Sequence, residues 1–182
     1  MFVRYKEPTR DTRLKGCDYS IAGVYFVTIC THGRAKQLAV IRHGVAHLLR
    51  PGKIVRDSWF ELTTRFPTIE LDEFVVMPDH IHGIIALKKP GGAEPRRYAP
   101  EAIPKPSLIE IVGALKSVSA KQINRMMKTS GTVWQRSFHD RIIRSGEALD
   151  KIRRYIRENP LRWSFERDEL AAPVNVGNKK TA

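Results

Sequence analysis

Two apolar runs separated by a Pro-Asp turn constrain what this chain can fold into. Residues 72–77 and 80–87 are rich in β-branched and aliphatic side chains, which predicts two strands joined as a hairpin. The second run begins with His80-Ile81-His82. Because alternate residues of a strand share a face, we expect both imidazoles on one side of the sheet and Ile81 on the other. Such a pair is either half of a metal site or two hydrogen-bonded or surface histidines.

The charge balance of the chain indicates a polyanionic partner. Its 182 residues include 32 Lys and Arg but 19 Asp and Glu, so that the formal net charge is +13. This excess favours nucleic acid, with an anionic membrane surface as the rival partner. No apolar run approaches the ~20 residues of a spanning helix, and the first residues lack the apolar core of a signal peptide. We therefore expect a cytoplasmic, nucleoid-associated protein that does not use a membrane.

Composition along the chain indicates one domain. We expect it to occupy residues 1–170 and to be followed by a flexible tail at 171–182. Residues 1–20 form a polar, basic arm, which is either solvated or in contact with phosphates. Five prolines and two glycines at 88–106 predict a loop between elements rather than a domain boundary.

The periodicity of apolar residues predicts an α+β fold. Strands are expected where β-branched and aromatic residues cluster, and helices where apolar residues recur every three or four positions. An antiparallel sheet with the helices packed on one face fits the order best. The predicted elements are strand 24–30, a short strand at 44–49 after a polar loop, helix 53–66, strands 72–77 and 80–87, a helix from the Ser107–Glu110 capping box to Met127, an extended segment 133–144, and a helix from Ser145 that stops at Pro160.

The last predicted helix carries a tyrosine at the edge of its apolar stripe. Ile152 and Ile156 belong to the stripe, whereas Tyr155 lies on its flank and Asn159 lies one turn beyond Tyr155 on the same side. The hydroxyl of such a tyrosine is either available for chemistry or simply accompanies a packed ring. Asn159 is likewise either a ligand or the residue that closes the helix before Pro160.

Two motifs far apart in the chain carry a resemblance to a known family. Met77–Gly83 (MPDHIHG) followed by Tyr155–Pro160 (YIRENP) resembles the single-tyrosine HUH transposases, in which two histidines flank a hydrophobic residue. Within them, the chain is most similar to the REP-associated tyrosine transposase branch. Residues 18–20, 25–28 and 134–144 also resemble this family, so the resemblance covers about residues 15–165. It implies a ferredoxin-like, RRM-like α+β sandwich.

The resemblance also implies a reaction. Tyr155 would be the nucleophile, and His80, His82 and Asn159 would hold a divalent metal ion, Mg²⁺ or Mn²⁺. The substrate would be single-stranded DNA with hairpins, cleaved and rejoined through a 5′-phosphotyrosine that keeps the bond energy. Two imidazoles and one amide oxygen favour Mn²⁺ over Mg²⁺, while cellular abundance favours Mg²⁺.

Arginines close in sequence to the proposed site are the candidates for DNA contacts, because such charges give salt-sensitive affinity. They are Arg136, Arg141, Arg144, Arg153, Arg154 and Arg157. Trp134, Phe138 and Tyr98 have rings that can stack on unpaired bases, although Trp134 and Phe138 fit the core equally well. His139-Asp140 is either a second acid/base pair or an oriented histidine, and we favour the structural role because no nucleophile lies beside it.

Other functions fit parts of the sequence. A non-catalytic single-stranded nucleic-acid-binding protein of similar fold would have the same charge, but it would not need Tyr155 and Asn159. A metal hydrolase built on His80 and His82 would need a carboxylate ligand that is not evident. The sequence does not distinguish a monomer from a homodimer that exchanges the helix of Tyr155, and it does not give the DNA target.

Overall fold

The computed structural model describes residues 21–88 and 106–171, with side chains as far as residue 165. The predicted basic arm, nearly all of the Pro- and Gly-rich loop with Tyr98, and the tail after Ala171 lie outside the described residues. In the described part of the chain, no helix combines the length and the apolar character that a membrane crossing requires.

Four antiparallel strands form the central sheet, in the order β4-β5-β1-β6. They are β1 (Gly23–Cys30), β4 (Ile69–Val76), β5 (His80–Leu87) and β6 (His139–Ile143). The central strands β1 and β5 pair along their whole length, from Gly23 opposite Leu87 to Cys30 opposite His80. The predicted hairpin of two strands around the Pro-Asp turn is confirmed as β4 and β5.

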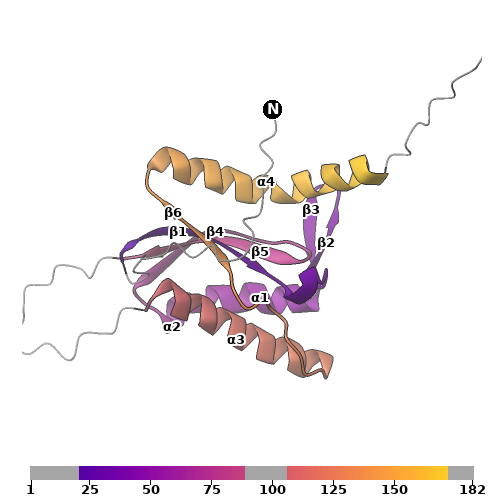
Figure 1. Cartoon of the computed structure of the whole chain (residues 1–182), viewed down its shortest axis with the longest axis horizontal. Coiled ribbons are helices and arrows are strands. Elements are labelled where there is room, and N and C mark those ends of the chain that lie inside the picture. Colours follow the sequence, from indigo (N-terminus) through magenta and orange to yellow (C-terminus); the bar gives the residue numbers. More distant parts are fainter. Residues whose placement is uncertain (1–20, 89–105, 172–182) are drawn as a thin grey trace, which may run out of the picture.

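Helices cover both faces of this sheet (Figure 1). On one face lie α1 (Arg50–Phe60), α2 (Leu62–Arg65) and α3 (Leu108–Met127), and α4 (Gly146–Ala171) crosses the other. The predicted α+β class and antiparallel sheet are confirmed, but the helices are divided between two faces instead of sharing one. The reason is that β1 is apolar on both sides: Val27 belongs to the main core under α1 and α3, and Phe26 belongs to a second cluster with Ile156 of α4.

The main core is built around Trp59, which is fully buried. Its indole stacks on Phe74 with ring centroids 4.5 Å apart. It also lies against Gly83, where a Cβ atom would overlap the indole ring. A glycine inside a strand often marks such a close approach, and here it lets α1 pack tightly on β5.

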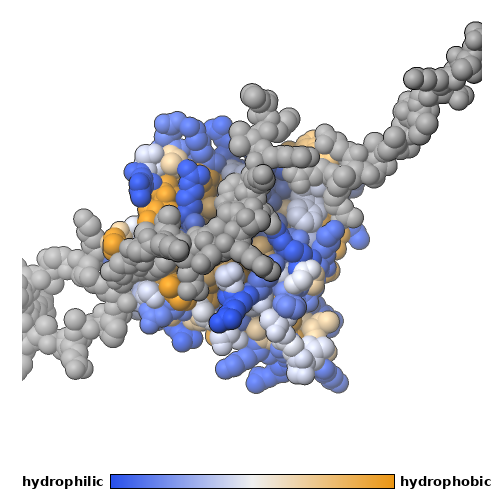
Figure 2. Space-filling model, in the orientation of Figure 1, coloured by the Kyte–Doolittle hydropathy of each residue, from blue (hydrophilic) through white to orange (hydrophobic). Residues whose placement is uncertain are grey.

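The helix α3 begins and ends where local sequence signals place it. The Ser107 hydroxyl accepts the Glu110 backbone N–H at 3.2 Å, and the Glu110 carboxylate accepts the Ser107 backbone N–H at 2.7 Å, which confirms the capping box. At the other end Lys128 adopts a left-handed conformation with φ 54°. The lower edge of the molecule, where α3 lies in Figure 1, is mostly hydrophilic in Figure 2.

A second, two-stranded sheet consists of β2 (Ala39–Arg42) and β3 (Val45–Leu48). Its turn residues His43 and Gly44 both have positive φ, 49° and 71°, as a two-residue type I′ hairpin requires. The predicted short strand at 44–49 is confirmed as β3, whereas β2 falls in the segment predicted as a polar loop. Four residues between polar flanks give too weak a period for a strand to be predicted.

The prediction that the last helix stops at Pro160 is wrong, because α4 continues to Ala171 with Pro160 inside it. Proline removes one backbone hydrogen bond and normally kinks or ends a helix. Here the following turn gains tertiary contacts: the Leu161 side chain lies so close to Gly44 that a Cβ atom there would contact it at 2.7 Å. The ring centroids of Trp163 and His80 lie 5.9 Å apart. The Lys36 ammonium lies over the Trp163 ring, with its nitrogen 5.9 Å from the ring centroid.

We predict that Gly83→Ala destabilises the fold by about 1–3 kcal/mol, since its methyl group overlaps the buried Trp59 ring. Gly113→Ala on α3 is the matched control, because a Cβ atom there meets nothing within 4 Å. Alanine should stabilise that helix by about 0.5–1 kcal/mol. Urea unfolding of both variants measures the two changes, and equal stability of the two would contradict the close packing at Gly83.

Candidate active site

Two buried histidines of β5 face the helix α4. His80 and His82 are 7% and 5% exposed, while Ile81 between them points into the main core on the other face. The Nε2 atoms of the two imidazoles lie 3.1 Å apart. The predicted sharing of one face is therefore confirmed, and the two rings direct the same kind of nitrogen toward a common point.

The other nitrogen of each imidazole has its own polar partner. The Asp79 carboxylate accepts a hydrogen bond from His80 Nδ1 at 2.6 Å, and it lies 3.8 Å from Arg34 Nη1. His82 Nδ1 is 2.8 Å from the Thr28 hydroxyl, which can donate or accept and so supports either tautomer of His82. Outer partners of this kind orient imidazoles that bind metal ions.

Burial determines the charge of His82. Desolvation, together with the positive charges of His80 and Arg34, holds the pKa of His82 well below its usual range. His82 is therefore neutral at pH 7, as a metal ligand must be. Burial alone would raise the pKa of Asp79, but the hydrogen bond from His80 and the charges of His80 and Arg34 bring it below its usual value.

Two side chains of α4, two turns apart, contact the histidine pair, and a third lies between them along the helix. Tyr155 Oη is 3.5 Å from His82 Nε2, and its ring meets the His82 ring at a centroid distance of 5.3 Å. Trp163, two turns further on, lies against His80. Asn159 is midway between them and only 8% exposed. The structure thus brings three of the site residues that the sequence motifs single out, His80, His82 and Tyr155, into contact, and it buries the fourth, Asn159, one helical turn beyond Tyr155.

The donor atoms of this cluster fit a divalent cation. Two buried Nε2 atoms converge, and α4 offers the amide of the buried Asn159, one turn beyond Tyr155, as a candidate oxygen ligand. Among the described residues, no group of three or more His, Cys, Asp or Glu side chains could hold a metal ion. A metal at this position would therefore need the amide of Asn159, or donors from a bound substrate and water, to complete its coordination.

The predicted DNA-binding arginines fall into two groups. Arg153 and Arg157 pair with carboxylates of β4, namely Asp72 and Glu73. The other four are exposed, and Arg141 lies opposite Phe26 in register, on the face of the sheet that α4 covers. These four are Arg136, Arg141, Arg144 and Arg154.

The aromatic candidates have mainly structural surroundings. Trp134 is 3% exposed in the main core, and its indole N–H donates to the Ser119 hydroxyl at 3.0 Å. Phe138 is half-buried against the same core. His139 lies opposite Thr28 in register, hence on the face of His82, and Asp140 points to the opposite face.

Sequence reasoning did not assign roles to Thr28 and Trp163, which contact the histidine pair. The alternation of β1 is a usable signal for Thr28, because it puts this residue on the same face as Phe26. Trp163 lies beyond Pro160, where the helix was expected to have ended, so its approach to His80 depends on packing that no local pattern encodes.

A comparison with known proteins shows the family of the chain. No protein-family model matches the chain. An uncharacterized protein of Haemophilus influenzae (strain ATCC 51907 / DSM 11121 / KW20 / Rd) is 30% identical over 167 residues, which cover 88% of this chain and 92% of that protein. The chain belongs to the same family as this protein.

A solved structure, that of a REP-associated tyrosine transposase bound to a REP hairpin, is similar to this chain with a TM-score of 0.55 and 21% sequence identity. The similarity covers 81% of this chain and 72% of the transposase chain. The fold is therefore the REP-associated tyrosine transposase fold, as the sequence motifs predicted.

We predict an acid-sensitive component of stability that arises from His82. Its pKa is depressed in the folded state, so the unfolded chain binds the extra proton first as the pH falls below about 6.5. The metal-free protein should lose up to about 1.4 kcal/mol of unfolding free energy per pH unit from this group below pH 6.5. His82→Asn, which keeps a polar atom near Thr28 and does not titrate, should lack this component.

Urea unfolding in EDTA at pH 7.5, 6.5 and 5.5 compares the two proteins. An identical pH dependence of both would show that His82 is not held neutral by its surroundings.

Proposed function

We propose that this protein is a single-tyrosine DNA strand transferase that cleaves and rejoins single-stranded DNA containing hairpins. The observation that carries the proposal is the contact of Tyr155 Oη with the buried histidine pair, 3.5 Å from His82 Nε2. The fold similarity to a transposase bound to a REP hairpin supports DNA hairpins as the partner. A net charge of +13 supports a polyanion of this kind, and a DNA substrate would place the protein with the nucleoid in the cytoplasm.

In the proposed reaction, Tyr155 Oη forms a bond to a backbone phosphorus while the bond from phosphorus to the 3′ oxygen breaks. The proton that the phenol loses balances the proton that the released 3′ hydroxyl gains. The product is a 5′-phosphotyrosine, which the 3′ hydroxyl of another strand can attack in the reverse sense. No nucleotide cofactor is needed, since the energy of the phosphodiester is retained in the new ester.

His80, His82 and Asn159 are the residues that would hold a divalent ion, Mg²⁺ or Mn²⁺. When bound, such an ion polarises the scissile phosphate and stabilises the charge that develops on it. This help is needed because a free tyrosine has a pKa of about 10 and only about 0.1% is ionised at pH 7. The chain itself contributes a buried, water-poor site and a fixed direction for the Tyr155 ring, which packs edge-on to Phe26 at a centroid distance of 6.1 Å.

One chain can supply the whole proposed site. Tyr155 reaches the histidines of its own chain, so exchange of α4 between two copies is not required for the reaction. We therefore propose that a monomer is competent. The exposed arginines at positions 136, 141, 144 and 154 remain our candidates for phosphate contacts beside the site.

Tyr155→Phe should bind hairpin DNA with unchanged affinity and form no covalent adduct, because the ring is kept while the nucleophile is lost. The measurement uses a pool of labelled single-stranded oligonucleotides with hairpins, incubated with Mn²⁺ and separated on a denaturing gel. The wild-type adduct should disappear with EDTA. An adduct that persists in Tyr155→Phe would assign the nucleophile elsewhere, and tight binding without any wild-type adduct would favour a non-catalytic binding protein.

Replacing both His80 and His82 by Ala should abolish the binding of Mn²⁺ measured by titration calorimetry. His47→Ala is the matched control, since His47 is an exposed histidine on β3 and should leave the titration unchanged. Mn²⁺ binding that survives the double substitution would place the metal outside the histidine pair.

A further inference from the structure

The strand β4 contains a bulge that directs two acidic side chains toward α4. Leu71 lies opposite Ile85 and Phe74 lies opposite Gly83, so two residues of β4 face the one residue of β5 between these partners. The two residues are Asp72 and Glu73. Leu71 and Phe74 on either side both pack into the main core. A bulge re-aims side chains, and this one puts two consecutive carboxylates on the face of the sheet that α4 covers.

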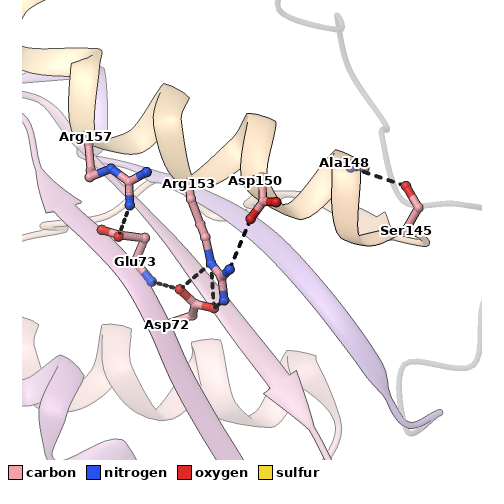
Figure 3. A network of polar contacts seen from close by, with 7 residues as sticks. All are labelled: Asp72, Glu73, Ser145, Ala148, Asp150, Arg153 and Arg157. Atoms are coloured by element: carbon pink, nitrogen blue, oxygen red, sulfur yellow. Dashed lines mark hydrogen bonds and ion pairs between the residues drawn. The ribbon is translucent and has the colours of Figure 1, made fainter.

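Both carboxylates bind arginines of α4 (Figure 3). Arg153 Nε lies 3.1 Å from each carboxylate oxygen of Asp72, and Arg153 Nη2 lies 2.6 Å from Oδ2. Arg157 Nη1 donates to the Glu73 carboxylate. Asp150 joins the network through Arg153 Nη1 at 3.2 Å, and the Glu73 backbone N–H donates to Asp72 at 2.7 Å. We call the four residues Asp72, Glu73, Arg153 and Arg157 the β4–α4 clamp.

The β4–α4 clamp lies on the opposite flank of α4 from the tyrosine. Arg153 and Arg157 are one turn apart on one flank, whereas Tyr155 is about 200° around the helix from Arg153. Ile152 and Ile156 lie between the two flanks and pack on the sheet. These apolar contacts hold the helix against the sheet, and the ion pairs on one flank add directional restraints on its rotation. A rotation of α4 that broke these polar contacts would change the distance between the Tyr155 hydroxyl on the other flank and His82.

Within the β4–α4 clamp, Asp72 is ionised near neutral pH. The hydrogen bond from Arg153 is the main reason that the pKa of Asp72 lies below its usual value, and the charges of Arg153 and Arg157 act in the same direction. Single exposed ion pairs contribute little to stability, but contacts of one arginine with both oxygens of a carboxylate fix geometry well. The arrangement is thus better suited to orient the helix than to hold the fold together.

We propose that Asp72 and Glu73 are positioning residues, which set the rotation of α4 and thereby place the Tyr155 hydroxyl over the histidine pair. This proposal rests on the proposed function of Tyr155 as nucleophile. It also assigns Arg153 and Arg157 to the positioning of the nucleophile rather than to DNA phosphates. Reactions of this type are sensitive to small displacements, since a shift of about 1 Å can cost about a hundredfold in rate.

The test separates DNA binding from the covalent step. Asp72→Asn and Arg153→Gln should each lower the rate of adduct formation at saturating hairpin DNA by about tenfold to a hundredfold, with little change in the Kd for DNA. The exchanged pair Asp72→Arg with Arg153→Asp should recover most of the rate, because it restores the ion pair in reverse. Glu147→Gln is the control, since its partner Lys151 lies on the same exposed helix surface and neither residue contacts the sheet in a described ion pair.

Thermal unfolding of each variant shows that it is folded at the assay temperature. The proposal is overturned if Arg153→Gln weakens DNA binding and leaves the saturating rate unchanged, because Arg153 would then be a phosphate contact. It is also overturned if the exchanged pair stays as slow as the single variants.

A spectroscopic measurement distinguishes failure of this proposal from failure of the proposed function. The Tyr155 ring lies against the His82 ring, so it should shift the NMR signals of the His82 ring protons, and Asp72→Asn should reduce that shift. If the wild-type protein forms no adduct, the proposed function fails while this shift still tests the positioning of Tyr155. A His82 signal that is the same in Asp72→Asn and the wild type would refute the role of the β4–α4 clamp.

Discussion

Two imidazoles lie buried between a helix and a sheet, and their neighbours in the site supply the hydrogen bonds that these buried rings require. A buried polar group without a hydrogen bond costs free energy, so each ring needs a partner in place before α4 can cover it. Asp79 and Thr28 supply these partners. The turn that carries Asp79 is itself fixed, because the backbone N–H groups of Thr31 and Leu38 donate to the carbonyls of Asp79 and Pro78 at 2.9 and 3.0 Å.

The basic residues of the chain differ in whether acidic side chains lie beside them. Arg153 and Arg157 of α4 are neutralised locally by carboxylates of β4, whereas Arg136, Arg141, Arg144 and Arg154 are exposed. An excess of basic residues predicts a polyanionic partner for the molecule as a whole, but it does not say which arginine meets the partner. That depends on where acids lie in three dimensions, and here a single bulge brings them to α4.

Elements with a strong local signal could be predicted from the sequence. The strand at 80–87 and the helix that starts after Ser107 agree with the structure, because the first is a continuous apolar run and the second has a capping box. The strand β2 and the part of α4 after Pro160 could not be predicted, since tertiary contacts override weak or contrary local preferences there. In the site, motifs point to His80, His82, Tyr155 and Asn159. The contact of Thr28 depends on strand register, that of Asp72 on the bulge, and that of Trp163 on the continuation of α4 beyond Pro160.

Pro160 has a consequence for how α4 transmits movement. The proline removes the backbone donor that would bond to the carbonyl of Ile156, so the hydrogen-bond ladder of the helix is weakest between Tyr155 and Trp163. The half before this point is anchored on β4, and the half after it rests on the β2–β3 hairpin through Leu161 and Gly44. The helix thus behaves as two segments with a compliant joint. We expect a displacement of the β2–β3 hairpin to bend α4 first at this joint, because one backbone hydrogen bond is missing there.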